Sequence, residues 1–529
     1  MSWRKKSYDE LPALSVRRHE LRRSMRLVTA AWMFGVVWMS CVSGSQFITF
    51  ARMMGLEDFG FGVLQALPFI ATFGQFFAAI LIERTGLRKF QFMTCATFGR
   101  SLWMLLAVIP FVLPIPSKAA VWAMMSILLV IYFMDALASP AWLTWMGYLI
   151  PRRIRGRYFA VRAQITQVVQ IIVVIAVGIL VDAMTVQGAS ETQPWLQPGL
   201  LYTICGILAV SSLFGMADIL LFRNIREVMP PAYVANTAPV LQMLLEPLKD
   251  RVFRNYVAYG AAFTFTTTIG AMFFWRTATE VLHFSKLATN VMFLVIVPVT
   301  GIMVSHWWGR MIDRWGRRPV LILGGVGTAV GTGSWLLASP NFSCPDFILG
   351  GGNVVAGWVG GFFGHPHWAW FDPRTPVTAY LIVLVGTIVS GIAWSGVALA
   401  QTGVILGFSD GKGKSASVAA ASVLISIGGA AGALIGGMLS EAMQTLHDHP
   451  LTAGPFVWNN WHILFAVAVV GRLLSLLLLR GMPDPGAAST RDLLRYMRSN
   501  ISNNILSMAF YPLRIFGWRR WSEGRDRGE

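Results

Sequence analysis

The sequence is poor in charged residues. Only 13% of its 529 residues are Asp, Glu, Lys or Arg, whereas 55% are hydrophobic and the mean hydropathy is +0.58. A soluble protein of this length needs more polar surface than such a composition supplies. The scarcity of charge therefore excludes an ordinary soluble protein and predicts one that lies in a lipid bilayer.

Cysteines and catalytic motifs are scarce as well. Of the 4 cysteines, Cys41, Cys95 and Cys205 lie within apolar runs and only Cys344 lies in a predicted loop, which excludes a disulfide framework. The chain contains no phosphate-binding glycine-rich loop, nucleophile elbow or convincing catalytic dyad. We predict that the protein is not an enzyme and not an ATP-driven pump, and that it uses no cofactor.

Long apolar runs, separated by short polar turns, recur along the chain. A helix needs about 20 apolar residues to cross the hydrocarbon core of a bilayer, and it satisfies its own backbone hydrogen bonds there. We therefore predict an all-α membrane protein. Its twelve transmembrane helices are expected at residues 27–50, 60–82, 90–113, 120–149, 163–184, 200–222, 254–280, 288–308, 319–338, 377–408, 417–443 and 459–481.

Basic residues are distributed unevenly between the two sets of loops. If the N-terminal tail and alternate loops are cytoplasmic, the opposite loops hold only Arg52, Lys118, Lys286 and Arg374 of the 43 Lys and Arg residues. Loops rich in Lys and Arg stay on the cytoplasmic side of a membrane. We therefore predict a multi-pass protein of the inner (cytoplasmic) membrane with both termini in the cytoplasm. The net charge of +18 then reflects membrane topology, and we predict no nucleic-acid binding.

A similar charged turn occurs once in each half of the chain. Residues 309–319 read GRMIDRWGRRP and residues 79–89 read AILIERTGLRK, and each turn lies between two apolar runs. Residues 178–184 and 437–443, at the ends of predicted helices 5 and 11, form a second matching pair. Matching segments in the two halves indicate a duplicated membrane protein.

The later turn resembles the signature loop of the major facilitator superfamily, whose pattern is Gly-x-x-x-Asp-Arg-x-Gly-Arg-Arg. The earlier turn departs from this pattern, with Ala79 for the first Gly, Glu83 for the Asp and Leu87 for a basic residue. We name the two turns together the gate motif. Its residues are Gly309, Asp313, Arg314, Gly316, Arg317 and Arg318 in the later turn, and Glu83, Arg84, Gly86 and Arg88 in the earlier turn.

The resemblance implies the fold of that superfamily, in which two six-helix bundles related by pseudo-symmetry form a secondary transporter. It also implies that an acid such as Asp313 docks on the amides at the start of helix 5 or 11 of the opposite bundle and holds the cytoplasmic side shut. The alternative is that these charges only fix topology and loop geometry.

The predicted helices and the turns between them define the domain organisation. Two bundles are joined by a polar, proline-containing linker, and the C-terminal tail has apolar residues at helical spacing among arginines, as in a helix that lies on a membrane surface. The expected parts are a basic cytoplasmic tail at 1–26, a bundle at 27–222, a cytoplasmic linker at 223–253, a bundle at 254–481 with a long external loop at 339–376, and an amphipathic basic tail at 482–529.

Charged residues inside the predicted helices are costly in hydrocarbon, so each is expected to have a partner or a task. Asp135 lies near the middle of helix 4 and Arg100 lies at similar depth in helix 3. We predict that Asp135 carries a proton or binds a polar substrate. The alternative is a static ion pair between Asp135 and Arg100. Asp218 and Arg472 occupy matching places in the two halves and are expected to be structural.

Two further groups of polar residues lie near the predicted external side. Arg276 and Glu280 are one helical turn apart in helix 7, so we expect them to pair with each other, the alternative being a gate on the external mouth. Histidine pairs in two external loops could bind a transition metal only if those loops meet. We therefore predict no metal site at His365, His367, His447 and His449.

Polar and aromatic residues on the helices that usually line the central cavity in this superfamily are candidates for binding the solute. An aromatic, lightly polar cavity suits a sugar-like or amphipathic organic molecule. Besides Asp135 and Arg100, the candidates are Gln46 in helix 1, Trp142 in helix 4, Thr267 in helix 7, and Trp394 and Gln401 in helix 10.

These observations predict a secondary active transporter that moves a small organic solute by alternating access and is coupled to protons. Its expected partners are the lipid bilayer, the solute and protons. A monomer is expected because each chain contains both halves of the pathway. The alternative is a membrane protein with this fold that does not transport and serves as a sensor or an assembly scaffold.

Overall fold

The apolar runs of the sequence form helices in the computed structural model, which describes residues 18–85, 87–150, 152–185, 197–225, 246–342, 345, 350–351, 353–355, 357–358, 376–407 and 415–481. Within these residues, 12 helical segments have the length and the hydropathy needed to cross a bilayer. The predicted number of transmembrane helices is therefore confirmed. Residues 1–17 of the N-terminal tail, the C-terminal tail, and parts of the linker and of the long loop lie outside the described residues.

The first six spans come from the first half of the chain. The first two spans each contain an interruption: Gly44, whose φ is +93°, separates the first two helices, and residues 72–73 separate the next two. A positive φ of this size favours glycine because a side chain would be strained there. The helices are α2 (Arg18–Cys41), α3 (Ser45–Met53), α4 (Asp58–Ala71), α5 (Gly74–Thr85), α6 (Arg88–Val112), α7 (Lys118–Leu149), α8 (Arg152–Met184) and α9 (Pro198–Leu221), followed by the short η3 (Phe222–Asn224).

The second half repeats this pattern. Two of its segments, η5 and η6, are π-helical, a geometry that often occurs near functional sites. The elements are η4 (Glu246–Lys249), α11 (Arg251–Thr268), α12 (Phe273–Arg276), η5 (Thr277–Val281), α13 (Lys286–Asn290), η6 (Val291–Ile296), α14 (Val297–Trp315), α15 (Arg317–Gly333), η7 (Ser334–Leu336), α17 (Val377–Gly407), α18 (Ser415–Ala442), α19 (Gln444–Asp448), β1 (Leu451–Ala453), β2 (Phe456–Trp458), α20 (Asn460–Ser475) and η8 (Leu476–Gly481).

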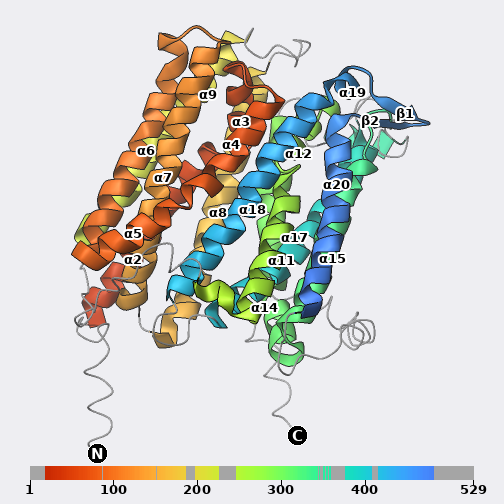
Figure 1. The fold of residues 1–529 in the computed structure, drawn as a ribbon. Helices are drawn as coiled ribbons and strands as arrows, with labels where there is room; N and C mark the ends of the chain where they lie inside the picture. Colours follow the sequence, from red (N-terminus) through yellow and green to blue (C-terminus); the bar gives the residue numbers. More distant parts are fainter. Residues whose placement is uncertain are drawn as a thin grey trace, which may run out of the picture.

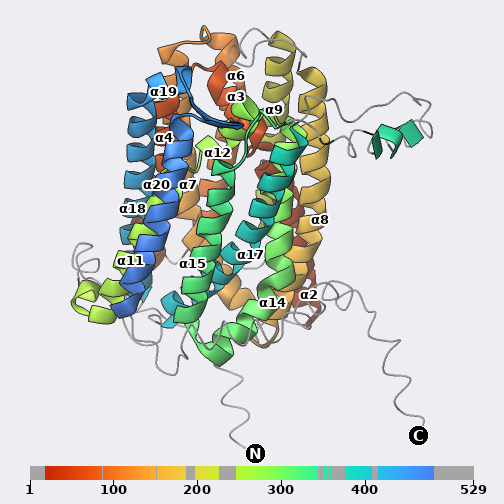
Figure 2. The ribbon, with the colours of Figure 1, turned by 90° about the vertical axis from the view of Figure 1, so that its right-hand side faces the viewer.

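The helices form two bundles, one from each half of the chain. Figure 1 shows helices of the first half, in red to yellow, on one side and helices of the second half, in green to blue, on the other. Figure 2 shows the same helices running roughly parallel to a common axis. The fold is the predicted pair of six-helix bundles related by pseudo-symmetry. We call the end that carries the turns at 85–88 and 315–317 the motif end, and the end that carries α3, α12 and the hairpin of β1 and β2 the far end.

Each bundle has its own apolar interior, while other large apolar side chains point outward. Phe50 and Phe61 are fully buried in the first bundle, and Phe253 and Tyr256 are almost fully buried in the second. Trp122, by contrast, is 72% exposed on the outside of the bundles. Apolar side chains on the outer surface fit a protein whose surroundings are lipid.

Close packing within the second bundle depends on glycines at intervals of four residues. A Cβ atom added to Gly428, Gly432 or Gly436 of α18 would collide with a backbone carbonyl oxygen of α11. Small residues at this spacing let two helix backbones approach closely, which matters in lipid because burial of apolar area no longer drives helices together. The contact between α11 and α18 therefore has no room for side chains at these positions.

We expect Gly432→Ala to lower the stability of the protein, because the added methyl group must push α11 and α18 apart at a cost of about 1–3 kcal/mol. Thermal unfolding of the purified protein in detergent measures this effect. Gly206→Ala in α9 is the matched control, since nothing lies within 4 Å of a Cβ at that position. Equal melting temperatures for the two variants would contradict the packing described for α11 and α18.

Candidate functional site

Asp135 lies near the middle of α7 and is half-buried. In the part of the chain that the structure describes, no hydrogen bond or ion pair joins its carboxylate to another residue. A carboxylate within a membrane span that has no such partner costs free energy in its charged form, so it is a candidate for binding a proton or a solute.

Arg100 forms an ion pair with a different residue from the one considered in the sequence. Its Nη1 contacts the Asp218 carboxylate of α9 and donates to the Gly215 carbonyl oxygen at 3.1 Å. Its guanidinium also lies 4.3 Å from the centre of the Trp38 ring. The alternative of an Asp135–Arg100 ion pair is therefore wrong. The reason is that α6 packs on α9 as well as on α7, and a buried Asp218 is available there.

Gln46 joins the two bundles. Its Nε2 donates to the carbonyl oxygen of Ser40, near the end of α2, at 2.9 Å. Its Oε1 accepts from Asn290 Nδ2 at 3.0 Å. The Ser45 backbone N–H donates to Asn290 Oδ1 at 2.8 Å. Gln46 is completely buried, so it lies in a contact between α3 and α13.

The remaining solute candidates lie in two different places. Trp142 is half-buried in α7, and its ring centre is 5.2 Å from the Arg162 guanidinium. Thr267 and Trp394 both line a cavity of about 230 Å³ within the second bundle. Gln401 lies further along α17, where its carbonyl oxygen accepts from Tyr256 Oη at 3.4 Å. The structure thus brings together Thr267 and Trp394, and it separates them from Gln46 and Trp142.

The later turn of the gate motif has the sharp geometry that its glycine allows. Gly316 has a φ of +89° and lies between the end of α14 and the start of α15. Asp313 and Arg314 are exposed and Arg317 and Arg318 are half-buried, whereas Gly309 has open space around it. Docking of Asp313 on helix 5 or 11 stays a prediction, because the side chains at the starts of α8 and α18 lie outside the described residues.

The earlier turn is described only in part. Arg88 is buried at the start of α6, while Gly86 and the side chains of Glu83 and Arg84 lie outside the described residues. Of the predicted histidine pairs, His365 and His367 also lie outside them. His447 lies 4.8 Å from the Trp461 ring, measured between ring centres.

Arg276 is the centre of a charged network at the far end. Its Nε and Nη2 donate to the Glu280 carboxylate at 2.8 and 2.9 Å, as the spacing of these residues predicts. Its Nη1 pairs with the carboxylate of Asp58, which begins α4 in the other bundle. Arg52 Nε lies 3.5 Å from Glu280 Oε1 and adds a second ion pair between the bundles.

Asp58 also accepts hydrogen bonds from the second bundle. Trp461 Nε1 donates to Asp58 Oδ2 at 2.9 Å, Ser440 Oγ donates to the same oxygen, and Asn460 Nδ2 lies 3.4 Å from it. We name this set the far-end network. Its residues are Arg52, Asp58, Arg276, Glu280, Ser440, Asn460 and Trp461.

A carboxylate on a helix N-terminus forms another contact between the bundles. Asp182 near the end of α8 accepts from the backbone N–H groups of Lys286 and Leu287 at 2.8 and 2.9 Å. These amides begin α13, where the positive end of the helix dipole favours a negative charge. The sequence predicts an acid on helix amides at the motif end; the structure describes such a contact at the far end.

Glycines at matching positions bring the bundles close together beside these polar groups. A Cβ on Gly178 of α8 would lie 2.8 Å from Leu287 Cα, and a Cβ on Gly437 of α18 would lie 2.9 Å from Gly62 Cα in α4. The two glycines occupy the same place in the repeat. The far end is therefore closed by two related contacts, α8 with α13 and α4 with α18.

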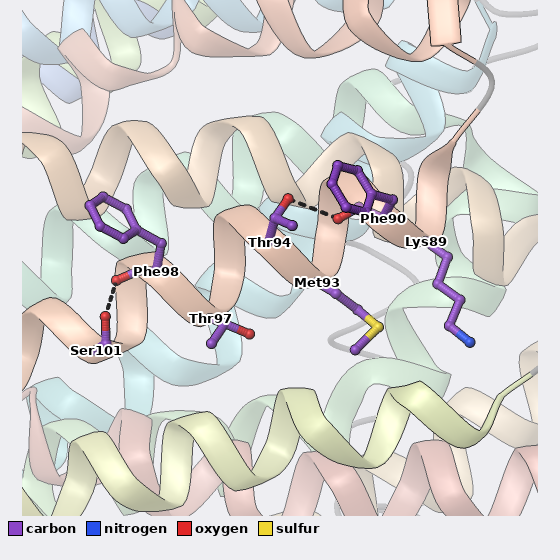
Figure 3. A pocket seen from close by; sticks show the side chains of 7 residues that line it. All are labelled: Lys89, Phe90, Met93, Thr94, Thr97, Phe98 and Ser101. Carbon is purple, nitrogen blue, oxygen red and sulfur yellow. Dashed lines mark hydrogen bonds between the residues drawn. The ribbon is translucent and has the colours of Figure 1, made fainter.

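A groove of about 660 Å³ runs along one face of α6 (Figure 3). Phe90 and Phe98 beside it are 64% and 51% exposed. Thr94 and Ser101 donate to backbone carbonyl oxygens of the same helix, so their donors are already used. These exposed rings mark the groove as part of the outer surface of the bundle, whereas Arg100 on the same helix points inward to Asp218.

The two-bundle fold of 12 apolar spans defines a polytopic helical membrane protein. A model of the Major Facilitator Superfamily matches residues 33–371. The chain belongs to the Major Facilitator Superfamily, a family of membrane transporters. No curated protein sequence gives a match to this chain.

Solved structures with the same fold have little sequence identity to the chain. The nucleoside transporter NupG superposes with a TM-score of 0.57 and 12% identity over 88% of this chain and 98% of its own. The xylose transporter XylE from E. coli, in a partially occluded inward open conformation, gives 0.53 and 13% over 89% and 100%. A D-xylose-proton symporter gives 0.55 and 14% over 86% and 96%.

We expect Asp58→Asn to lower the melting temperature by several degrees, because the substitution removes one of two carboxylates that neutralise the buried Arg276. Leaving such a charge unpaired costs about 3–5 kcal/mol, and Glu280 remains, so a loss of roughly 2 kcal/mol is expected. Glu57→Gln is the matched control, since Glu57 is the neighbouring acid and is exposed. If both variants melt at the wild-type temperature, the far-end network does not stabilise the protein.

Proposed function

We propose that this protein is a proton-coupled secondary transporter that moves a small organic solute across the membrane by alternating access. Membership of the Major Facilitator Superfamily supports the transport mechanism. The observation that carries the coupling is Asp135, a carboxylate in the middle of α7 with no hydrogen bond or ion pair to another described residue. A group without a fixed partner can bind a proton and release it as the pathway opens to each side.

The far-end network supplies the closed state of one side. It consists of hydrogen bonds and ion pairs, which water can replace when the bundles part. The contacts of Asp58, Asp182 and Gln46 cross between the bundles, so a rigid-body rotation of one bundle would break them together. We infer that the gate motif, centred on Asp313 and Gly316, closes the motif end when the far end opens.

The orientation follows from the distribution of basic residues. We propose that the motif end faces the cytoplasm, together with both termini, in an inner membrane. The structure would then represent a state closed to the outside. A monomer is proposed because one chain contains both bundles, and no step above requires a second copy.

We expect Asp135→Asn to abolish proton-driven solute movement, because an amide cannot bind and release a proton at this position. Proteoliposomes that contain a pH-sensitive dye measure proton flux when xylose, uridine, phenylacetate or an amino acid is added. Asp448→Asn, an exposed change on α19, is the control and should keep wild-type flux. Normal proton flux in Asp135→Asn would refute the coupling role of Asp135.

The same vesicles test the alternative of a sensor or scaffold. A transporter releases a preloaded solute in exchange for external solute even when the proton step is blocked, so Asp135→Asn should retain exchange. Lack of both flux and exchange for every solute in the wild-type protein would favour a protein with this fold that does not transport.

We expect the double variant Gly178→Cys/Leu287→Cys to stop transport when a disulfide forms, because the bond would hold α8 and α13 together. The Cβ atoms at these positions would lie 3.1 Å apart, shorter than the separation of about 3.8 Å found in disulfides, so α8 and α13 must move slightly apart to admit the bond. Flux should return after reduction, and each single variant should respond to neither treatment. Full flux in the oxidised double variant, with no free thiol left at either position, would contradict alternating access at this end.

A further inference from the structure

Arg472 is a buried cation near the middle of the last span. Its side chain lies in α20 and the residue is 3% exposed. Its Nη1 donates to the Thr328 carbonyl oxygen at 2.9 Å and contacts the Thr332 hydroxyl. Within the described residues, its Nε has no hydrogen-bond partner and no carboxylate forms an ion pair with it. The guanidinium therefore keeps its positive charge without a negative neighbour in that part of the chain.

The position equivalent to Arg472 in the first bundle holds an acid that has a charged partner. Asp218 of α9 matches Arg472 of α20 in the repeat, and it pairs with Arg100 of α6. Arg276 has two carboxylates. A cation without a carboxylate is costly in a membrane span, by about 2.5–3.5 kcal/mol even on insertion scales. An anion beside Arg472 would balance this charge.

The space for an anion lies beside Arg472. A cavity of about 230 Å³ has Arg472 in its lining, together with residues of four other transmembrane spans. Part of its wall is aromatic: Trp275 and Phe293 have ring centres 4.4 Å apart, and Phe293 and Trp335 have ring centres 5.7 Å apart. Trp394 lines the same cavity. Aromatic walls of this kind bind a flat organic group, whereas a small inorganic ion would leave them uncovered.

We propose that this cavity binds a small organic acid, with the carboxylate paired to Arg472 and its organic part against the aromatic side chains of the wall. This inference rests on the proposed function and gives the solute a chemical class, that of an organic monoanion. One guanidinium balances one negative charge, and a carboxylate matches its planar donors in a two-point contact.

The hydroxyl groups in the cavity refine this class. Thr267 Oγ1 donates to the Phe263 carbonyl oxygen at 2.8 Å, and Thr387 Oγ1 donates to the Val383 carbonyl oxygen at 2.7 Å. Their oxygens thus remain acceptors. They suit a hydroxyl or N–H group on the solute.

The test is thermal unfolding and equilibrium binding of the purified full chain in detergent, with benzoate, phenylacetate and indole-3-acetate as probes. Each acid is compared with its neutral amide and with sodium chloride at the same ionic strength. We expect at least one acid to raise the melting temperature in a dose-dependent way, while the amides and chloride do not. No response to all three acids, or an equal response to an amide or to chloride, would overturn the proposal.

Variants assign the effect to this cavity. Arg472→Gln should weaken binding of the responding acid roughly 10- to 100-fold, the loss expected for a charged hydrogen-bonded pair. It should change the melting temperature without ligand only slightly, because it removes the cost of a buried charge together with the hydrogen bonds to Thr328 and Thr332. A large drop would mean that Arg472 serves to hold α20 on α15 and would contradict the proposal. Arg480→Gln, an exposed change in η8, should leave binding unchanged.

A second variant keeps the test independent of the charge. Thr267→Leu should narrow the cavity and weaken binding of the acid while Arg472 stays in place. Unchanged affinity in Thr267→Leu would place the acid elsewhere and refute the site. Binding and transport are measured separately, so the two proposals can fail independently. Acid binding without flux in vesicles would reject the proposed function. Flux of a neutral solute without acid binding would reject this inference alone.

Discussion

The far end of this transporter depends on the neutralisation of Arg276. A guanidinium that is 1% exposed in a membrane span is costly unless carboxylates neutralise it, and one of the two that Arg276 contacts belongs to the other bundle. Asp58 in turn uses Trp461, Ser440 and Asn460 as donors, so four spans meet at one ion pair. A single buried charge thus fixes how the two bundles approach each other.

Duplication explains why the closure has two parts. Helices α8 and α18 occupy matching places, and each presents a glycine to a span of the opposite bundle, at Gly178 and Gly437. The polar groups beside these glycines differ: Asp182 caps the start of α13, whereas Ser440 donates to Asp58 at the start of α4. Duplication has preserved the close approach of the helices and has allowed its chemistry to change.

The sequence predicts the helices well because each span must be long and apolar by itself. It also predicts the Arg276–Glu280 pair, whose members are one turn apart. It misses Asp58, which is 218 positions from Arg276 and reads as an ordinary acid at a helix start. The prediction of an Asp135–Arg100 pair is wrong for the same reason. The sequence shows how deep a residue lies along its helix, but it does not show which helix packs against each face.

The distance between the bundles at the far end tests most directly whether the far-end network holds that end closed. Spin labels at Lys118 and Thr452, exposed sites on the first and second bundles, would report this distance in the wild type and in Asp58→Asn. We expect one narrow, short distance in the wild type and an added longer component in the variant. Identical distributions in the two proteins would contradict the role given to the network.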